Sequence, residues 1–414
     1  MDRFRIMKPE MAKPDSPEKQ LPYAGIRVVE FTHMVMGPTC GMVLADLGAE
    51  VIKVEPIGHG REGDATRKLI GSGAGFFPLF NRNKKSLALD LQSPEGKEAV
   101  LKLIATADIV SENFKPGTMK KLGLDYDSLK TLNPRLIYVS HKGFLPGPYD
   151  HRTALDEVVQ MMGGLAYMTG RPGDPLRAGT SINDIMGGLF GAIGAMAALS
   201  AREKTGQGQE VQTALFENNV FLVAQHMMQY AVTGKPAAPM PARISAWGIY
   251  DVFKVSDGEQ IFLAVVSDTA WDIFCDAFGF ADLKDDPRLK SNNDRVRARE
   301  WMMPLLRERL ANFSAAELSA TFEKHALPFA PITRPQDLLE DPHLLATGGL
   351  APITLPDGRE TKTVLLPITL GGERPGIRLS PPKLGEHSAE LLTELGYSAT
   401  EIEALSPPTV KYSD

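Results

Sequence analysis

The stretch 25–55 constrains the fold of this chain most strongly. An apolar, β-branched run over 25–31 is followed by a glycine-bearing turn, a short helical pattern over 42–49 and a second apolar run over 50–55. A strand, a helix and a strand this close together form a βαβ unit, whose strands are parallel members of one sheet. We therefore predict a doubly wound α/β domain, with further strands at 86–91, 109–111 and 136–141 and helices at 94–106, 118–122 and 126–131.

A change of composition marks the end of this domain. After a helix expected over 217–232, the run 235–243 is rich in proline and is typical of a linker. Beyond it, 247–265 alternates in polarity like a β-hairpin, and helical patterns follow. We predict a small α+β domain there, and then extended segments over 349–381 and a pair of polar helices over 384–405.

Overall composition argues against several classes of protein. The chain has 414 residues, 43% hydrophobic and 23% charged, as in ordinary globular proteins. The net charge of −6 argues against a nucleic-acid partner, and no apolar run reaches the roughly 18 residues that span a membrane. The chain has two cysteines, Cys40 and Cys275, which are too few for a disulfide scaffold. Together with a polar start that lacks a signal-peptide core, they favour a cytoplasmic protein. The histidines lack metal-binding spacing, so we expect no metal site.

The stretch 177–209 carries the most suggestive carboxylate. Small polar residues lead to Asp184, and an apolar helix follows that ends at Lys204-Thr205-Gly206. A carboxylate where a helix begins can cap backbone N–H groups or act as a reagent, and spacing alone favours the cap. The glycines of this helix, at 187, 188, 191 and 194, cost about 1 kcal/mol each relative to alanine. We therefore expect another backbone or a flat ligand to approach the helix closely.

The loops of the α/β domain give weaker signals. The first βα turn, GPTCG at 37–41, lacks the G-x-G-x-x-G of dinucleotide-binding proteins. A dehydrogenase with Glu55 as ribose ligand is therefore a weak alternative, and a plain charged strand end is preferred. Basic residues near strand ends could converge on one polyanion or simply face solvent: Arg61, Arg67, Lys68, Arg82, Lys84, Lys85, Lys115, Lys120, Lys121 and Lys142.

Several stretches distributed along the chain match one protein family: VVEFTHMVMGP, LADLGAEVIKVEP, FNRNKKSLALDL, ENFKPGTMKKLGLDY, TGRPGDPLRAGTSINDIMGG, AREKTGQGQEV and PPKLGEHSAELLTELGY. On these motifs the chain resembles the class III CoA-transferases, the CaiB/BaiF family of formyl-CoA transferase and the carnitine CoA-transferase, over 21–405. The resemblance implies an interlocked-ring homodimer. In each chain a Rossmann-like large domain is formed by 21–235 and a returning segment, 336–414, around a small α+β domain at 236–335. Residues 1–20 are expected to form a disordered tail.

The resemblance also implies a chemistry. CoA and acyl-CoA would be substrates rather than bound cofactors, and the second substrate would be a small carboxylic acid. The family's nucleophile falls on Asp184, which would form an aspartyl anhydride and then an aspartyl-CoA thioester. Matching positions imply CoA contacts at Val35, Met36, Leu89, Asp90, Leu91, Gln92, Asn113, Phe114, Lys115, Lys121, Lys142, Gly143 and Phe144.

The chain departs from formyl-CoA transferase at several of these positions. Val35 replaces a glutamine that orients acyl groups, Pro56 replaces an arginine near the adenine, and the mobile glycine run over the site is missing. Lys121 stands where arginine is common, so its phosphate contact would be monodentate. We expect other acids than formate and oxalate. Side chains that could bind a second carboxylate, as in succinate, are His33, Arg61, Arg67, His141, Arg152 and Arg243.

Two other functions within reach of the same fold are less favoured. The 2-methylacyl-CoA racemases of the superfamily place a histidine base directly before an aspartate, and here that pair reads Leu155-Asp156. Leucine cannot act as a general base. A protein that binds CoA without catalysis is the remaining alternative.

Overall fold

The computed structural model describes residues 21–243 and 245–405, so the tail expected at 1–20 lies outside the described residues. The chain forms two compact units. One combines the described residues up to Met240 with those from Pro342 onward, and the other spans Pro241–Asp341.

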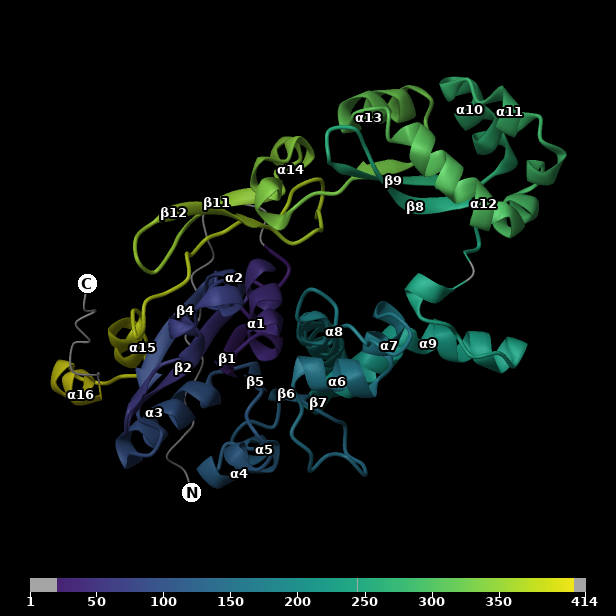
Figure 1. The fold of residues 1–414 in the computed structure, drawn as a ribbon. Coiled ribbons are helices and arrows are strands. Elements are labelled where there is room, and N and C mark those ends of the chain that lie inside the picture. The colour runs from purple at the N-terminus through teal and green to yellow at the C-terminus, as the bar shows by residue number, and fades with distance from the viewer. Residues whose placement is uncertain (1–20, 244, 406–414) are drawn as a thin grey trace. The chain divides into compact units, whose positions relative to one another are not determined.

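The first unit is built on a seven-stranded sheet (Figure 1). Its parallel strands lie in the order β4-β2-β1-β5-β6-β7, and the short β3 (Arg61–Glu62) pairs antiparallel with the end of β2. The chain moves outward from β1 through β2 to β4, and then continues on the other side of β1 with β5. This confirms the predicted parallel sheet and places a topological switch point between β1 and β5. The parallel strands are β1 (Arg27–Phe31), β2 (Glu50–Gly58), β4 (Lys84–Leu89), β5 (Ile109–Glu112), β6 (Ile137–Lys142) and β7 (Glu210–Ala214).

Helices cover both faces of this sheet, because neighbouring strand residues point to opposite sides. In β1, Val28 belongs to a core with α1 (Met36–Asp46) and α8 (Ile182–Thr205). The next residue, Val29, belongs to a core with α3 (Pro94–Ala105) and α15 (Ser388–Glu394). The other helices of the unit are α2 (Phe76–Phe80), α4 (Thr118–Leu122), α5 (Tyr126–Leu132), α6 (Asp156–Met162), α7 (Leu165–Thr169), α9 (Leu215–Thr233), α14 (Pro342–Ala346) and α16 (Ala399–Leu405).

Helix α1 begins at Met36, earlier than the sequence pattern indicated. Its first turn contains Gly37 and Pro38, which we had assigned to the loop. Proline is tolerated in a first helical turn because the N–H group that it lacks would have no partner inside the helix there. The loop after β1 is therefore shorter than expected, and it brings the helix start close to the strand end.

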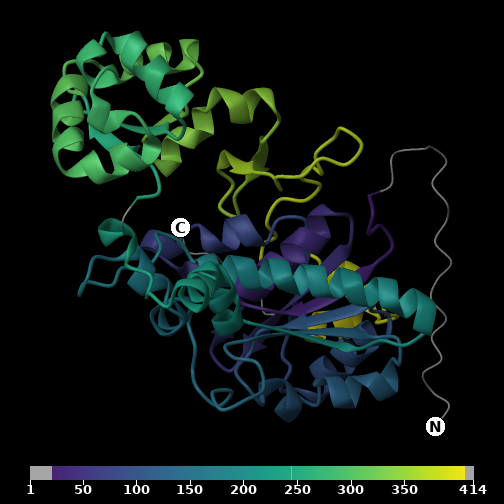
Figure 2. The same ribbon diagram turned by 90° about the vertical axis from the view of Figure 1, so that its right-hand side faces the viewer.

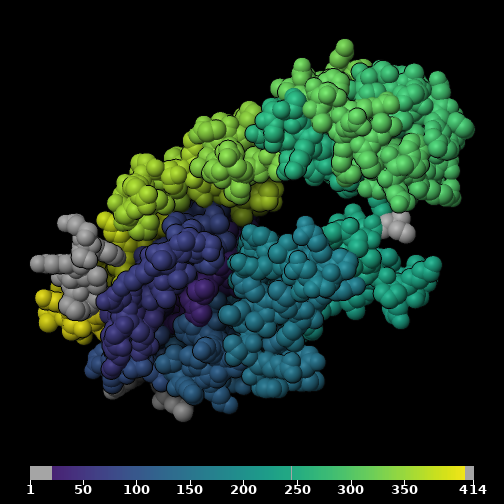
Figure 3. Space-filling model, in the orientation of Figure 1, coloured from purple at the N-terminus to yellow at the C-terminus, as the bar shows by residue number. Residues whose placement is uncertain are grey.

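The C-terminal segment returns to the sheet beside β4. Helix α15 (Ser388–Glu394) places Leu391 and Leu392 in the core formed with α3. The backbone N–H of Ala88 in β4 donates to Ser388 Oγ at 3.1 Å. Figures 1 and 2 both show this yellow segment beside the blue strands, and in Figure 3 the yellow and blue residues form a continuous surface. Before α15, β11 (Leu350–Thr354) and β12 (Glu360–Val364) form an antiparallel hairpin.

The second unit has its own core. Strands β8 (Ile249–Lys254), β9 (Gln260–Val265) and β10 (Phe329–Pro331) form an antiparallel sheet in the order β10-β9-β8. The buried side chains Trp271, Phe274 and Phe322 pack with those of the sheet. Its helices are α10 (Asp268–Phe278), α11 (Ala281–Lys284), α12 (Asn292–Leu310) and α13 (Ala315–Lys324).

Among the described helices, α8 is the one that is long and apolar enough to cross a membrane by length and composition. Its most apolar window is 44% buried inside the unit, against α1, β6 and β7. A core helix of a globular domain satisfies the same criterion, so this property is a weak indication of a membrane span.

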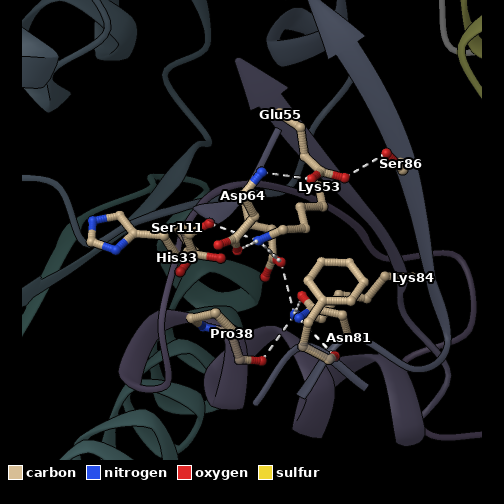
Figure 4. Close-up of polar contacts among 12 residues, drawn as sticks. His33, Pro38, Lys53, Glu55, Asp64, Asn81, Lys84, Ser86 and Ser111 are labelled. Atoms are coloured by element: carbon tan, nitrogen blue, oxygen red, sulfur yellow. Dashed lines mark hydrogen bonds and ion pairs between the residues drawn. The ribbon is translucent and has the colours of Figure 1, made fainter. Parts of the chain in front are cut away.

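A network of buried charges lies under α1, between the strands and the loops that follow them (Figure 4). Lys84 Nζ donates to Glu30 Oε1 at 2.7 Å and to the Pro38 carbonyl oxygen at 2.9 Å. Lys53 Nζ lies 2.9 Å from Asp64 Oδ2. These four charged side chains are 5% exposed or less, and burial lowers the pKa of Lys84 to about 8. Charges in such surroundings are tolerated only with partners, because each has lost its hydration.

The same network extends along β2 to Glu55. Its carboxylate accepts from Ser86 Oγ at 2.6 Å, from the Asp64 N–H at 2.9 Å and from Arg67 Nε at 2.8 Å. Glu55 is 1% exposed. It is therefore an internal anchor rather than a ribose ligand, and the dehydrogenase hypothesis loses its main residue.

We predict that Lys84→Met lowers the free energy of unfolding by about 3–5 kcal/mol, because it leaves Glu30 buried without its main partner. The double variant Glu30→Gln/Lys84→Met should lose less than the sum of the two single changes. Urea unfolding followed by circular dichroism measures all three. Lys130→Met serves as the control, since Lys130 pairs with Asp127 on the surface and should matter by less than about 1 kcal/mol. Additive losses would contradict the coupling.

Candidate active site

Two carboxylates with different partners lie at the start of α8, one from α8 itself and one from α6. Asp156, the first residue of α6, accepts hydrogen bonds from the backbone N–H groups of Asn183 at 2.7 Å and Asp184 at 3.0 Å. Asp156 therefore caps α8 from a neighbouring helix. Asp184 itself makes no cap hydrogen bond, and no side-chain partner of its carboxylate is found among the described residues. The interpretation of Asp184 as the helix cap, which spacing alone favoured, is wrong.

The surroundings of Asp184 disfavour its charged form. Burial is the main cause, followed by the nearby negative charges of Asp156 and Glu157, and together they raise the pKa of Asp184 from 3.8 to about 7. Buried carboxylates without hydrogen-bond donors or cations hold their protons more tightly. A carboxylate with a pKa near neutrality in a polar site is suited to act as a nucleophile or a base.

Helix α8 lies unusually close to α1. A Cβ atom at Gly188 would lie 2.5 Å from the Met36 carbonyl oxygen and 2.5 Å from Thr39 Cβ, so a side chain there would collide with α1. A Cβ atom at Gly187 would lie 2.6 Å from Asn218 Nδ2 and would also collide with the Met36 side chain. The close approach that the glycines predicted is thus made by a neighbouring helix. It sets the helix face that carries Asp184 against Met36, one of the predicted CoA contacts.

The loops at the switch point are tied together. Asn113 Oδ1 accepts from the His33 N–H at 2.9 Å, and Asn113 Nδ2 donates to the His33 carbonyl oxygen at 2.7 Å. The rings of His33 and Phe114 stack with centroids 5.7 Å apart. Lys53 Nζ holds the start of the same loop through the Thr32 carbonyl oxygen at 2.6 Å. Both polar atoms of the Asn113 side chain are therefore bonded to the loop after β1. A ligand could contact Asn113 only through its backbone groups.

Met34 is a member of this loop that sequence reasoning missed. Its φ of 62° lies in the left-handed region, which is costly for a side chain without a local hydrogen bond, and it is 38% exposed. Backbone strain of this kind gathers at functional sites. No signal in the sequence marked it, because the conformation depends on the ties made by Asn113 and Lys53.

A buried carboxylate, Glu112, organises the next group of predicted contacts. It accepts from the Phe114 N–H at 3.0 Å and from the Ser140 hydroxyl, and it lies 3.7 Å from Lys142 Nζ. Burial raises its pKa, although Ser140, Lys142 and the Phe114 N–H oppose the shift. Glu112 thus links the turn after β5 to the end of β6. Sequence reasoning did not single it out.

Most of the predicted CoA contacts lie at or just after the carboxyl ends of β1, β4, β5 and β6, at one edge of the sheet. Leu89 and Lys142 are the last residues of β4 and β6, and Lys121 lies in α4. Side chains differ in access: Val35, Met36, Leu89, Leu91 and Phe144 are buried, Asp90 and Gly143 are half-buried, and Gln92, Lys115 and Lys121 are exposed. Asp90 Oδ2 lies 3.4 Å from His59 Nε2. The buried members can reach a ligand only through their backbone or after local movement.

Several of the basic residues considered for a polyanion are used internally. Arg82 pairs with Asp46 at 2.7 Å, and Lys85 pairs with Glu50 at 2.8 Å. Arg67, Lys68 and Lys84 pair with Glu55, Glu62 and Glu30. The remaining candidates from that set are Arg61, Lys115, Lys120 and Lys121, and Lys142 pairs with Glu112 at 3.7 Å.

The same correction applies to two residues proposed for a second substrate carboxylate. Arg67 is committed to Glu55, and His141 is 4% exposed with its Nε2 3.1 Å from Ser111 Oγ. Burial lowers the pKa of His141 to about 3, so the ring is neutral. Within the described residues, no group of three or more histidines, cysteines and carboxylates is placed to hold a metal ion.

Comparisons with known proteins converge on one family. A family model described as CoA-transferase family III matches residues 23–388. The chain is 35% identical to the succinate–glutarate CoA-transferase of Agrobacterium fabrum, over 92% of this chain and 97% of that protein. It is 32% identical to the succinyl-CoA–D-citramalate CoA-transferase of Chloroflexus aurantiacus, over 90% and 94%. The crystal structure of a CaiB/BaiF family protein from Brucella suis matches with a TM-score of 0.82 and 36% identity, over 91% of this chain and 100% of that one.

The raised pKa of Asp184 predicts a cost in stability that depends on pH. Between its ordinary pKa of 3.8 and its folded value of about 7, the folded state binds the proton more tightly than the unfolded state. Stability is therefore lost as pH rises through this window and stays lower above it. Asp184→Asn should raise the melting temperature by a few degrees at pH 8 and by almost nothing at pH 4. Calorimetry at both pH values measures this, with Asp150→Asn as a surface control, and an equal gain at both would contradict it.

Proposed function

Since this chain belongs to CoA-transferase family III, and is thus an acyl-CoA:carboxylate CoA-transferase, we propose that it moves CoA through the carboxylate of Asp184. The observation that carries this proposal is the half-buried Asp184 carboxylate at the start of α8, which accepts no N–H group of the helix among the described residues and whose pKa is raised to about 7. At neutral pH a large share of such a group is ionised, and it is poorly hydrated, which favours attack on a thioester.

The proposed reaction has two symmetrical halves. Asp184 attacks the carbonyl carbon of the donor thioester, forming an aspartyl acyl anhydride and releasing CoA thiolate. The thiolate then attacks the aspartyl carbonyl, giving an aspartyl-CoA thioester and the free donor acid. The acceptor carboxylate attacks that thioester, which releases CoA thiolate and forms a second anhydride. The thiolate then attacks the acceptor carbonyl of this anhydride and gives the acceptor's CoA thioester. Asp184 is regenerated with one oxygen from the acceptor, and no redox change occurs. Covalent catalysis of this kind divides one difficult exchange into easier steps.

We also propose a dicarboxylate among the substrates, with succinate as the first candidate. Two relatives that cover nine-tenths or more of the chain are named for succinate or succinyl-CoA. Of the side chains considered for a second carboxylate, Arg61 and Arg152 keep this capacity in the first unit, and Arg243 belongs to the second unit. Burial lowers the pKa of His33, which favours its neutral ring. A racemase is disfavoured, because Leu155 supplies no base beside Asp156.

The family resemblance leads us to propose a homodimer, in which a second copy covers apolar surface on α8 and α9. Ile193 of α8 is 57% exposed, and Phe221 and Val232 of α9 are 67% and 77% exposed. Large apolar side chains gathered on two long helices are typical of an interface. We further propose a cytoplasmic location, which the free, buried thiols of Cys40 and Cys275 support.

Asp184→Ala should lower CoA transfer by about three orders of magnitude or more, because the nucleophile is lost. In the wild-type protein, a single turnover with an acceptor acid carrying ¹⁸O in its carboxylate should place one heavy oxygen in Asp184. Mass spectrometry of the peptide that contains this residue measures the label, and Asp150→Ala is the control. Full transfer by Asp184→Ala would refute the mechanism. Exchange of the α-proton without CoA movement would indicate the racemase instead.

The double variant Phe221→Glu/Met228→Glu should weaken self-association, since it places charge in the apolar surface of α9. Analytical ultracentrifugation should show a smaller species or a dissociation constant raised by at least tenfold. Ser128→Glu, an exposed change on α5, is the control and should leave the mass unchanged. A variant that remains as tightly associated as the wild type would exclude this face of α9 from the interface.

A further inference from the structure

We propose that Asp156 is a positioning residue of this site: its buried carboxylate fixes the start of α8, and its negative charge makes the adjacent Asp184 carboxylate a stronger nucleophile. The inference rests on the proposed role of Asp184 and concerns how that residue is activated. It assigns a role to a residue of α6 that touches neither reacting atom.

The position of Asp156 is fixed on both of its oxygens. Oδ2 receives the N–H groups of Asn183 and Asp184, and Oδ1 receives the side-chain amide of Gln160. Gln160 is fully buried, and its Oε1 in turn accepts from the Ala178 N–H at 2.8 Å. Because each oxygen already has its donors, the Asp156 carboxylate cannot rotate toward Asp184 or share a proton with it without breaking these bonds.

Two carboxylates thus compete for one helix start. The exposed N–H groups of a first helical turn carry partial positive charge that stabilises an anion. Here Asp156 takes the N–H of Asp184 itself, so this stabilisation goes to the cap and not to the nucleophile. Asp184 is left with the electrostatic repulsion of a near neighbour and with no donor of its own among the described residues.

Within the part of the chain that the structure describes, the charges that act most on Asp184 belong to α6. From α6, Glu157 also carries a negative charge, and it pairs with the exposed Arg177. The uncharged Met36 of α1 and the neutral Asn218 of α9 pack against Gly187, and the neutral Asn219 of α9 accepts from the Asn183 side chain. Asp156 therefore dominates the charge around the nucleophile, after the effect of burial.

The repulsion acts at one stage of the cycle. It exists while Asp184 is a free carboxylate, and it disappears when the group becomes a neutral anhydride or thioester. A contact that destabilises the free enzyme and not the covalent intermediate lowers the barrier to forming that intermediate. Asp156 would therefore favour the acylated enzyme while holding the helix that carries the nucleophile.

The test replaces charge while keeping shape. In Asp156→Asn, the amide oxygen can still accept the N–H groups of Asn183 and Asp184, while the hydrogen bond from the Gln160 side chain is lost. We expect the acidic limb of the kcat/KM profile to move to lower pH by about one unit. We expect kcat on the alkaline plateau to fall about threefold, because a less basic carboxylate is a weaker nucleophile. Among the described residues Glu157 has no hydrogen bond to α8, because its carboxylate pairs with Arg177. Glu157→Gln should therefore move the acidic limb in the same direction but by a smaller pH interval. Asp150→Asn, an exposed loop change, is the control for charge alone and should not move it.

The outcomes separate this inference from the proposed function. An unmoved acidic limb in a folded Asp156→Asn protein overturns the inference, while Asp184→Ala still tests the nucleophile independently. If Asp156→Asn does not fold, Glu157→Gln decides the charge effect, and an unmoved limb there overturns it. Asp156→Glu, which keeps the charge, should retain the wild-type limb, and a limb that moves as far as in Asp156→Asn would assign the effect to lost packing.

Discussion

The close contact between α8 and α1 is the constraint on which the site depends. Glycines at 187, 188 and 191 remove the side chains that would collide with Met36, Thr39 and His141. Each glycine costs helix propensity, and the burial of both helices against the sheet offsets that cost. The packing fixes where α8 begins relative to the loop after β1. Asp184 therefore lies near the edge of the sheet at which the parallel strands end and their loops begin.

Buried ion pairs fix the positions of the loops, as the glycines fix the packing of α8 against α1. Lys53 and Lys84 point into the space between strands and α1, where they bind carbonyl oxygens of Thr32 and Pro38 as well as carboxylates. Such pairs add little net stability, since desolvation consumes most of the attraction. They do fix geometry, because any other arrangement leaves a buried charge without a partner. The loop that carries Met34 is held in place in this way, and so is the turn anchored by Glu112.

The site brings together two aspartates that are separated in sequence and places them in opposite situations. Asp156 accepts the N–H groups of Asn183 and Asp184, whereas the described residues provide no hydrogen bond to the Asp184 carboxylate. A helix start with free N–H groups would hold a nucleophilic carboxylate ionised. Instead its N–H groups are occupied, and Asp184 is kept basic by burial and repulsion. Reactivity and stability are opposed at this residue, as is common where a charged group must stay poorly solvated.

The sequence by itself determined the parallel sheet, the glycine-studded helix and the position of Asp184 at its start, because hydrophobic periodicity and helix-ending residues are local properties. The family resemblance assigned the predicted CoA contacts, most of which lie at or just after strand ends. Only the tertiary structure showed that Asp156 is the cap, that Glu55 and Arg67 are internal partners, and that His141 is a buried neutral ring. Those assignments depend on which distant residues meet and how much water they lose. No spacing along the chain records either quantity.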